Sequence, residues 1–169
     1  MQFTDTSERG FQKFITKYLV AEHHYVETAP NEFDREFCIH TSQVLAFIDA
    51  TQPDAYEMIQ KKGERPFLVR LDEKIKELGV VEVLRKGVKH LDKTIDLFYR
   101  KPSSNYNTKD AARYAANLFS VTQELVYSSD PNNKNRLDLT VFVNGIPVMT
   151  CELKNPLSGQ YVQNGIRQY

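Results

Sequence analysis

Apolar and polar residues alternate along two neighbouring stretches near the C-terminal end of the chain. Residues 137–143 read LDLTVFV, with Leu or Val at every odd position, and residues 146–154 read IPVMTCELK, with polar side chains at most of the later even positions. A period of two is typical of a strand with one buried face. Asn144 and Gly145 stand between the two stretches and form a preferred turn sequence, so the pattern predicts a β-hairpin.

The register of this hairpin decides which polar side chains share a face. A two-residue loop at 144–145 would pair Asp138 with Cys151 and would set the apolar face of one strand beside the polar face of the other. A shift of one residue reverses every side chain, and a three-residue loop at 143–145 with a β-bulge provides that shift. We therefore expect the three-residue loop. The polar residues that then share one face are Asp138, Glu152 and Lys154.

Helical and extended patterns alternate through the rest of the chain. The first predicted helix has Ser7 as its N-cap and carries its apolar face at positions 11, 14, 15, 18 and 19. Further helices are predicted over 41–50, 54–61, 66–78 and 108–119, strands over 94–100 and 120–127, and a last helix after Pro156. This order predicts an α/β (mixed α+β) fold, with a central mixed sheet flanked by helices and with extra N-terminal helices.

The shared face of the hairpin suggests a metal site. Two carboxylates on one face repel each other unless a cation lies between them. Mg²⁺ commonly takes one or two protein carboxylates together with a phosphate, and the carbonyl of Leu153 is a further ligand in reach. Lys154 would orient a water molecule or stabilise charge on a phosphoryl group. These groups suit metal-assisted hydrolysis of a phosphodiester, and the alternative is a surface hairpin with an ordinary cross-strand Glu–Lys pair.

The same residues resemble a known nuclease family. An aspartate on one strand followed by Glu-x-Lys on the next resembles the core of the PD-(D/E)xK nucleases. The longer string NRLDLTVFVNGIPVMTCELKNP resembles the N-terminal nuclease domain of type I restriction enzyme R subunits, as do EFDREFCIHTSQVLAFIDATQPDAYEMI, VLRKGVKHLDKTIDLFYRKPSS and NLFSVTQELVYS. The resemblance runs from about Ser7 to Pro156. It implies that Asp138 and Glu152 bind the metal and that Lys154 is catalytic.

Two features of the family are less regular in this chain. Members often have a Gln-x-x-x-Tyr motif on the helix after Glu-x-Lys, but here Gly165 stands four residues before the final tyrosine. The candidate substitutes are Gln163, Gln168 and Tyr169. Members also often carry a glutamate on the first helix, for which Glu8 is the candidate. Gln12 occupies a second position of this helix where an acid would suit the family pattern better. The alternative for Glu8 is an acid that stabilises the helix dipole.

The resemblance implies a Mg²⁺-dependent DNA endonuclease domain of a type I restriction-modification enzyme, in a bacterial or archaeal cytoplasm. Cleavage would follow ATP-driven translocation by a motor, and no GxxxxGK[ST] occurs here, so ATP would bind elsewhere in the R subunit. The chain stops within a predicted helix, which favours residues 1–169 as a single nuclease domain cut from a longer protein. The implied partners are DNA, the rest of the R subunit, and the methylation and specificity subunits. A repair or resolvase nuclease and a catalytically silent assembly module stay open.

Composition refines this picture. Lys and Arg number 22, as do Asp and Glu, and zero net charge is unusual for a domain that holds DNA alone. Four basic residues would form a patch near the site: Lys134, Arg136, Lys154 and Arg167. The alternative is that they belong to an ordinary solvated face. No apolar run is long enough for a membrane span. Cys38 and Cys151 lack CxxC spacing and suggest reduced thiols. The four histidines form no zinc pattern with them and are expected on the surface, at His23, His24, His40 and His90.

Overall fold

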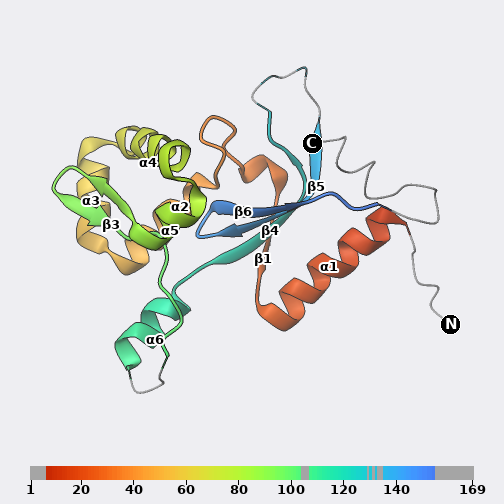
Figure 1. The fold of residues 1–169 in the computed structure, drawn as a ribbon, viewed down its shortest axis with the longest axis horizontal. Helices are drawn as coiled ribbons and strands as arrows, with labels where there is room; N and C mark the ends of the chain where they lie inside the picture. The colour runs from red at the N-terminus through yellow and green to blue at the C-terminus, as the bar shows by residue number, and fades with distance from the viewer. Residues whose placement is uncertain (1–6, 104–106, 129, 131, 133–134, 155–169) are drawn as a thin grey trace.

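The computed structural model describes residues 7–103, 107–128, 130, 132 and 135–154 (Figure 1). Its helices are α1 (Glu8–His23), α2 (Thr41–Thr51), α3 (Pro53–Lys62), α4 (Glu64–Leu78), α5 (Val80–Lys86) and α6 (Thr108–Ala115), with a 3-10 turn η1 (Pro30–Glu32). Its strands are β1 (Val26–Thr28), β2 (Val88–His90), β3 (Lys93–Ile95), β4 (Phe119–Val126), β5 (Arg136–Val143) and β6 (Ile146–Cys151). The predicted mixed α/β class is confirmed.

The central sheet has four strands in the order β1-β4-β5-β6. β1 runs parallel to β4, whereas β4, β5 and β6 form an antiparallel meander. The short hairpin of β2 and β3 is a separate sheet. Figure 1 shows this hairpin and helices α2–α5 gathered beside the left end of the central sheet, with α1 to its right.

Apolar residues cover both faces of the central sheet. On the α1 side, Val121, Leu139 and Val141 pack with Ile15 and Leu19 of the helix. On the other side lies a smaller cluster of Phe33, Leu125 and Phe142. The largest cluster fills the helical lobe and includes Val44, Ile48, Ile59, Phe67, Leu71 and Ile146. Ile146 follows the hairpin turn, so the lobe is anchored to the turn end of β5 and β6.

Helix α1 forms as expected but buries a different face. Its N-cap is confirmed, because the Ser7 side chain accepts a hydrogen bond from the Gly10 amide at 3.0 Å. The fully buried residues of the helix are polar, Gln12 and Thr16, and the aromatic residues assigned to the apolar face are exposed. The expected face is therefore wrong in part. The reason is that the helix crosses strand backbone, where a polar side chain satisfies a carbonyl that an apolar one would leave unpaired.

Residues 94–100 are not the single strand that the pattern predicted, because β3 ends at Ile95. Side-chain amides replace a strand partner beyond that point. Gln52 both donates to the Asp96 carbonyl and accepts from the Asp96 amide, each at 2.8 Å. Asn117 pairs in the same two ways with the backbone of Tyr99, at 2.7 and 3.1 Å. A segment whose backbone is paired in this way gains nothing from joining a sheet.

The prediction of four surface histidines is wrong for two of them. His23 and His24 are exposed, whereas His40 and His90 are buried. The His40 ring lies edge-on to Phe142 with ring centroids 4.3 Å apart, and its Nε2 is 3.1 Å from the Thr122 hydroxyl. Burial lowers the pKa of both side chains, which favours their neutral form.

In the described ranges no helix is long and apolar enough to cross a membrane.

Candidate active site

The β5–β6 hairpin turns through two residues, not the expected three. Val143 pairs with Ile146, so Asn144 and Gly145 alone form the loop, both with positive φ (49° and 81°). This is the backbone that Asn-Gly prefers in a two-residue hairpin turn. Tertiary contacts fix it, because the Asn144 side chain accepts from the Leu118 amide at 2.6 Å and donates to the Leu97 carbonyl at 2.8 Å.

The expected shift of one residue comes instead from a bulge inside the hairpin. Phe142 pairs with Pro147 but Val141 pairs with Met149, which leaves Val148 without an opposite residue. The pairing of Leu139 with Cys151 follows from this shift, and Asp138 and Glu152 are the next residues of the two chain segments beyond this last pair. The predicted loop length is therefore wrong, but the predicted neighbourhood of the two acids is the one found, because a bulge reverses side chains as a change of loop length does.

The acid pair and the lysine meet at the open end of the hairpin, and we call Asp138, Glu152 and Lys154 the acidic centre. One oxygen of the Asp138 carboxylate accepts a hydrogen bond from the Leu153 amide at 2.6 Å. The Lys154 ammonium lies 3.6 Å from Oε2 of Glu152, and these two side chains are only 17% and 6% exposed. The structure thus brings all three predicted residues together.

The electrostatics of the acidic centre concentrate on Glu152. Burial raises the pKa of its carboxyl group, the negative charge of Asp138 raises it further, and the charge and hydrogen bonding of Lys154 oppose both effects. The buried Oε2 of Glu152 is paired with the Lys154 ammonium at 3.6 Å, and within the described part of the chain no closer donor reaches it. One ammonium offsets only one of the two neighbouring carboxylate charges, so the acid pair still favours a further cation. The centre therefore has the character of a cation site.

Helix α1 supports the centre from the side. Gln12 Nε2 donates a hydrogen bond to the Asp138 carbonyl, which anchors β5 at the residue that carries the carboxylate. Glu8 lies one helical turn earlier, and its negative charge contributes to the raised pKa of Glu152. Position 12, where an acid would have suited the family pattern, thus holds the amide of Gln12. An amide can donate a hydrogen bond to a carbonyl, whereas an ionised carboxylate cannot.

Strand β4 is distorted opposite the centre, which the sequence pattern did not predict. Glu124 has a left-handed φ of 53° within the strand, at the position facing Asp138. Leu137 packs in the cluster of Phe142, whereas Leu139 packs on the α1 side. The assignment of Leu137 and Leu139 to one face is therefore wrong. A left-handed residue inside a strand re-aims the neighbouring side chains, and such distortions often lie near functional sites.

The donor set of the acidic centre fits a hard divalent cation. The groups that would hold it are the carboxylates of Asp138 and Glu152 and the carbonyl of Leu153, with water completing the shell as Mg²⁺ prefers. Across the described residues no group of three or more His, Cys, Asp or Glu side chains is placed to hold a metal ion, so a cation here depends on two carboxylates. The sequence candidates that lie outside the described residues are Lys134, Gln163, Arg167, Gln168 and Tyr169.

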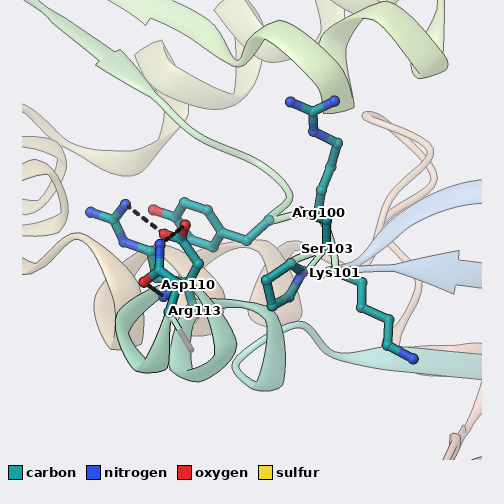
Figure 2. A pocket seen from close by; sticks show the side chains of 8 residues that line it. Arg100, Lys101, Ser103, Asp110 and Arg113 are labelled. Atoms are coloured by element: carbon teal, nitrogen blue, oxygen red, sulfur yellow. Dashed lines mark hydrogen bonds and ion pairs between the residues drawn. The ribbon is translucent and has the colours of Figure 1, made fainter. Parts of the chain in front are cut away.

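A separate hollow of about 650 Å³ lies between the segment after β3 and helix α6. It is lined by Tyr99, Arg100, Lys101, Pro102, Ser103, Asn107, Asp110 and Arg113. Figure 2 shows the side chains of Arg100, Lys101 and Arg113 pointing in different directions, so they do not converge on one ligand. The Arg113 guanidinium lies over the Tyr99 ring, 5.4 Å from its centroid. We therefore place the candidate chemistry at the acidic centre and not in this hollow.

The fold gives the structural class of the chain: a mixed sheet flanked by helices, in a nuclease-like α+β arrangement. Residues 13–169 match the family described as the type I restriction enzyme R protein N terminus. The chain belongs to this family, and the match includes the whole acidic centre. No curated protein matches the chain, and no solved structure matches it.

Proposed function

We propose that this chain is the nuclease domain of a type I restriction enzyme and that its acidic centre hydrolyses a DNA phosphodiester with the help of Mg²⁺. The observation that carries the proposal is the meeting of Asp138, Glu152 and Lys154, where two neighbouring carboxylates have one ammonium beside them, 3.6 Å from the buried Oε2 of Glu152. Family membership supports the context: DNA, the rest of the R subunit and the methylation and specificity subunits as partners, and an ATP-driven motor elsewhere in the enzyme.

Each residue of the centre has a distinct task in this proposal. When bound, Mg²⁺ supplies a Lewis acid that favours hydroxide at neutral pH and offsets phosphate charge. Asp138 and Glu152 hold the cation, and the Leu153 amide fixes the orientation of the Asp138 carboxylate through its 2.6 Å hydrogen bond. The ammonium of Lys154 stabilises the negative charge that develops on the phosphate oxygens. Gln12 is a positioning residue, because it acts only through the Asp138 backbone.

A thermal melt with and without metal tests the site directly. Mg²⁺ at ten times its dissociation constant stabilises a single-site protein by about 1.4 kcal/mol, which corresponds to roughly 3–5 °C for a chain of this size. We expect this increment for the wild type in Mg²⁺ or Mn²⁺ and its loss in Asp138→Ala. The matched control is Asp49→Ala, which removes an exposed carboxylate from α2 and should keep the increment. An increment that survives in Asp138→Ala would place the metal elsewhere and refute the assignment.

A further inference from the structure

Three large aromatic side chains stand exposed along α1. Phe11, Phe14 and Tyr18 are 52%, 64% and 52% exposed, although the helix buries Gln12 and Thr16 on its other side. Single exposed apolar residues are ordinary, but aromatic side chains repeated at helical spacing form a continuous patch. Patches of this kind on a protein surface mark a place where a partner binds. We call these three residues the aromatic row.

Basic side chains flank the aromatic row on the same helix. Arg9, Lys13 and Lys17 follow each other at intervals of four, so they lie along one exposed stripe of α1. Among the residues that the structure describes, no carboxylate forms an ion pair with any of the three. A purely apolar partner would leave this stripe without a counter-charge. Charge complementarity therefore favours an anionic partner that also offers flat apolar surfaces.

The aromatic row begins at the end of α1 that contacts the acidic centre. Phe11 is adjacent in sequence to Gln12, whose side chain donates to the Asp138 carbonyl from the other side of the helix, and Figure 1 shows the N-terminal end of α1 close to the end of β6. A helix rises 1.5 Å per residue, so the row advances by about 4.5 Å and then about 6 Å. These steps exceed the roughly 3.4 Å between stacked bases of a duplex strand. The spacing suits bases that are unstacked and splayed, which a duplex does not offer.

We propose that the aromatic row stacks the bases of an unpaired DNA strand along α1, the helix whose N-terminal end contacts the acidic centre, while the basic stripe formed by Arg9, Lys13 and Lys17 contacts its phosphates. This inference rests on the proposed nuclease function and specifies its substrate as DNA with an unpaired stretch near the scissile bond. Base–aromatic stacking tolerates every sequence because every base has a flat face. The aromatic row would therefore distinguish unpaired from paired DNA, and other parts of the enzyme would recognise the sequence.

Fluorescence anisotropy of the 169-residue chain in EDTA tests DNA binding by the aromatic row without any cleavage. The probes are a labelled 20-nucleotide oligothymidine and a labelled 20-base-pair duplex. We expect the wild type to bind the oligothymidine more tightly. Phe14→Ala should weaken that binding by about five-fold or more, the loss of one stacked base, and should leave duplex binding unchanged. Phe14→Leu should weaken it equally, and Phe14→Trp should restore it. Val81→Ala, an exposed apolar residue of α5, is the matched control.

Several results would overturn the inference. Equal affinity of the wild type for the two probes would do so, as would equal losses on both probes in Phe14→Ala. Wild-type binding by Phe14→Leu would show that bulk and not a flat ring is needed, which is the behaviour of a protein-docking surface. The binding test is separate from the proposed function, because it is run in EDTA and involves no metal and no cleavage. Oligothymidine binding that depends on Phe14, together with no Mg²⁺-dependent cleavage by the complete wild-type enzyme, would refute the nuclease proposal alone.

Discussion

The two ends of the β5–β6 hairpin hold polar side chains under opposite conditions. At the turn end, Asn144 is buried and its side-chain amide accepts from the Leu118 amide and donates to the Leu97 carbonyl and to Oδ1 of Asn117. At the open end, the Glu152 side chain is 6% exposed and lies beside Asp138, with the Lys154 ammonium 3.6 Å from its Oε2. Buried polar groups that are fully paired stabilise a fold, whereas two acids beside a single ammonium form a site that a bound cation would complete. The turn end of this hairpin therefore supports the fold, and the open end carries the candidate chemistry.

Removal of the lysine gives the sharpest test of the open end. In the complete enzyme, Lys154→Ala should lower the cleavage rate by about 10²–10³-fold, the usual effect of losing one group that stabilises transition-state charge. Plasmid cleavage in Mg²⁺ measures this. The control is Lys101→Ala in the separate hollow, which should cut at the wild-type rate. A Lys154→Ala enzyme as fast as the control would show that the open end is not catalytic.

The turn end should respond in stability. Asn144→Ala leaves the Leu118 amide and the Leu97 carbonyl unpaired in the interior, and it puts an alanine at a positive φ. Each unsatisfied buried group costs about 1–3 kcal/mol, so we expect a loss of roughly 2–4 kcal/mol in the free energy of unfolding, measured by urea titration. Asn132→Ala, outside the hairpin, should change little. A near-neutral Asn144→Ala would remove the contrast between the two ends.

The period-two pattern predicted the strands and the meeting of the acids because both depend only on alternation. It placed Asp138 and Glu152 on one face from the need to match apolar faces, and that match holds from Leu139 to Val141 but not at Leu137, which packs on the opposite face. The pattern could not tell a bulge at Val148 from a longer loop, since either provides the same shift. The choice depends on contacts from Leu97 and Leu118, which lie far away in sequence, to the turn.

Positions that serve the backbone were harder to predict than positions that serve the site. Gln12 looked like a weak substitute for an acid, because its partner is the carbonyl of Asp138, 126 residues away in sequence. The left-handed φ of Glu124 has no signal in the residue type, since glutamate rarely adopts it. His40 was expected on the surface because a single histidine carries no periodic pattern that would indicate burial. In each case tertiary contacts outweighed local preference.

The open end should weaken the fold as pH rises in the absence of metal. The pKa of Glu152 is raised above its ordinary value of 4.5, so its stabilising contribution is complete below that value and is lost as pH rises through the folded pKa. The slope contributed by one group is at most about 1.4 kcal/mol per pH unit. Glu152→Gln in EDTA should remove this slope in urea titrations between pH 4.5 and 7.5. An unchanged slope would mean that Glu152 is not under electrostatic stress.

The turn end should show the opposite dependence through His40. Its backbone amide donates to the Gly145 carbonyl at 2.8 Å, so the residue is part of the structure that holds the turn. Burial lowers the pKa of the imidazole below 6.5, so the unfolded chain takes up the proton first. The stability that neutral His40 provides is therefore complete above pH 6.5 and is lost as pH falls toward the folded pKa.

His90 has the same direction of shift, with burial as the first cause and Arg70 as the second, so it contributes to the same acid slope. In urea titrations between pH 7.5 and 5.5, His40→Gln should flatten the slope by less than about 1.4 kcal/mol per pH unit and leave the part due to His90. Asn132→Ala, an exposed and non-titrating control, should keep the wild-type slope. The slope decides the matter and not the midpoint, because His40→Gln also changes packing against Phe142. A slope identical to that of the control would mean that the imidazole takes up its proton without unfolding, and the turn end would then not be the rigid region that the contrast requires.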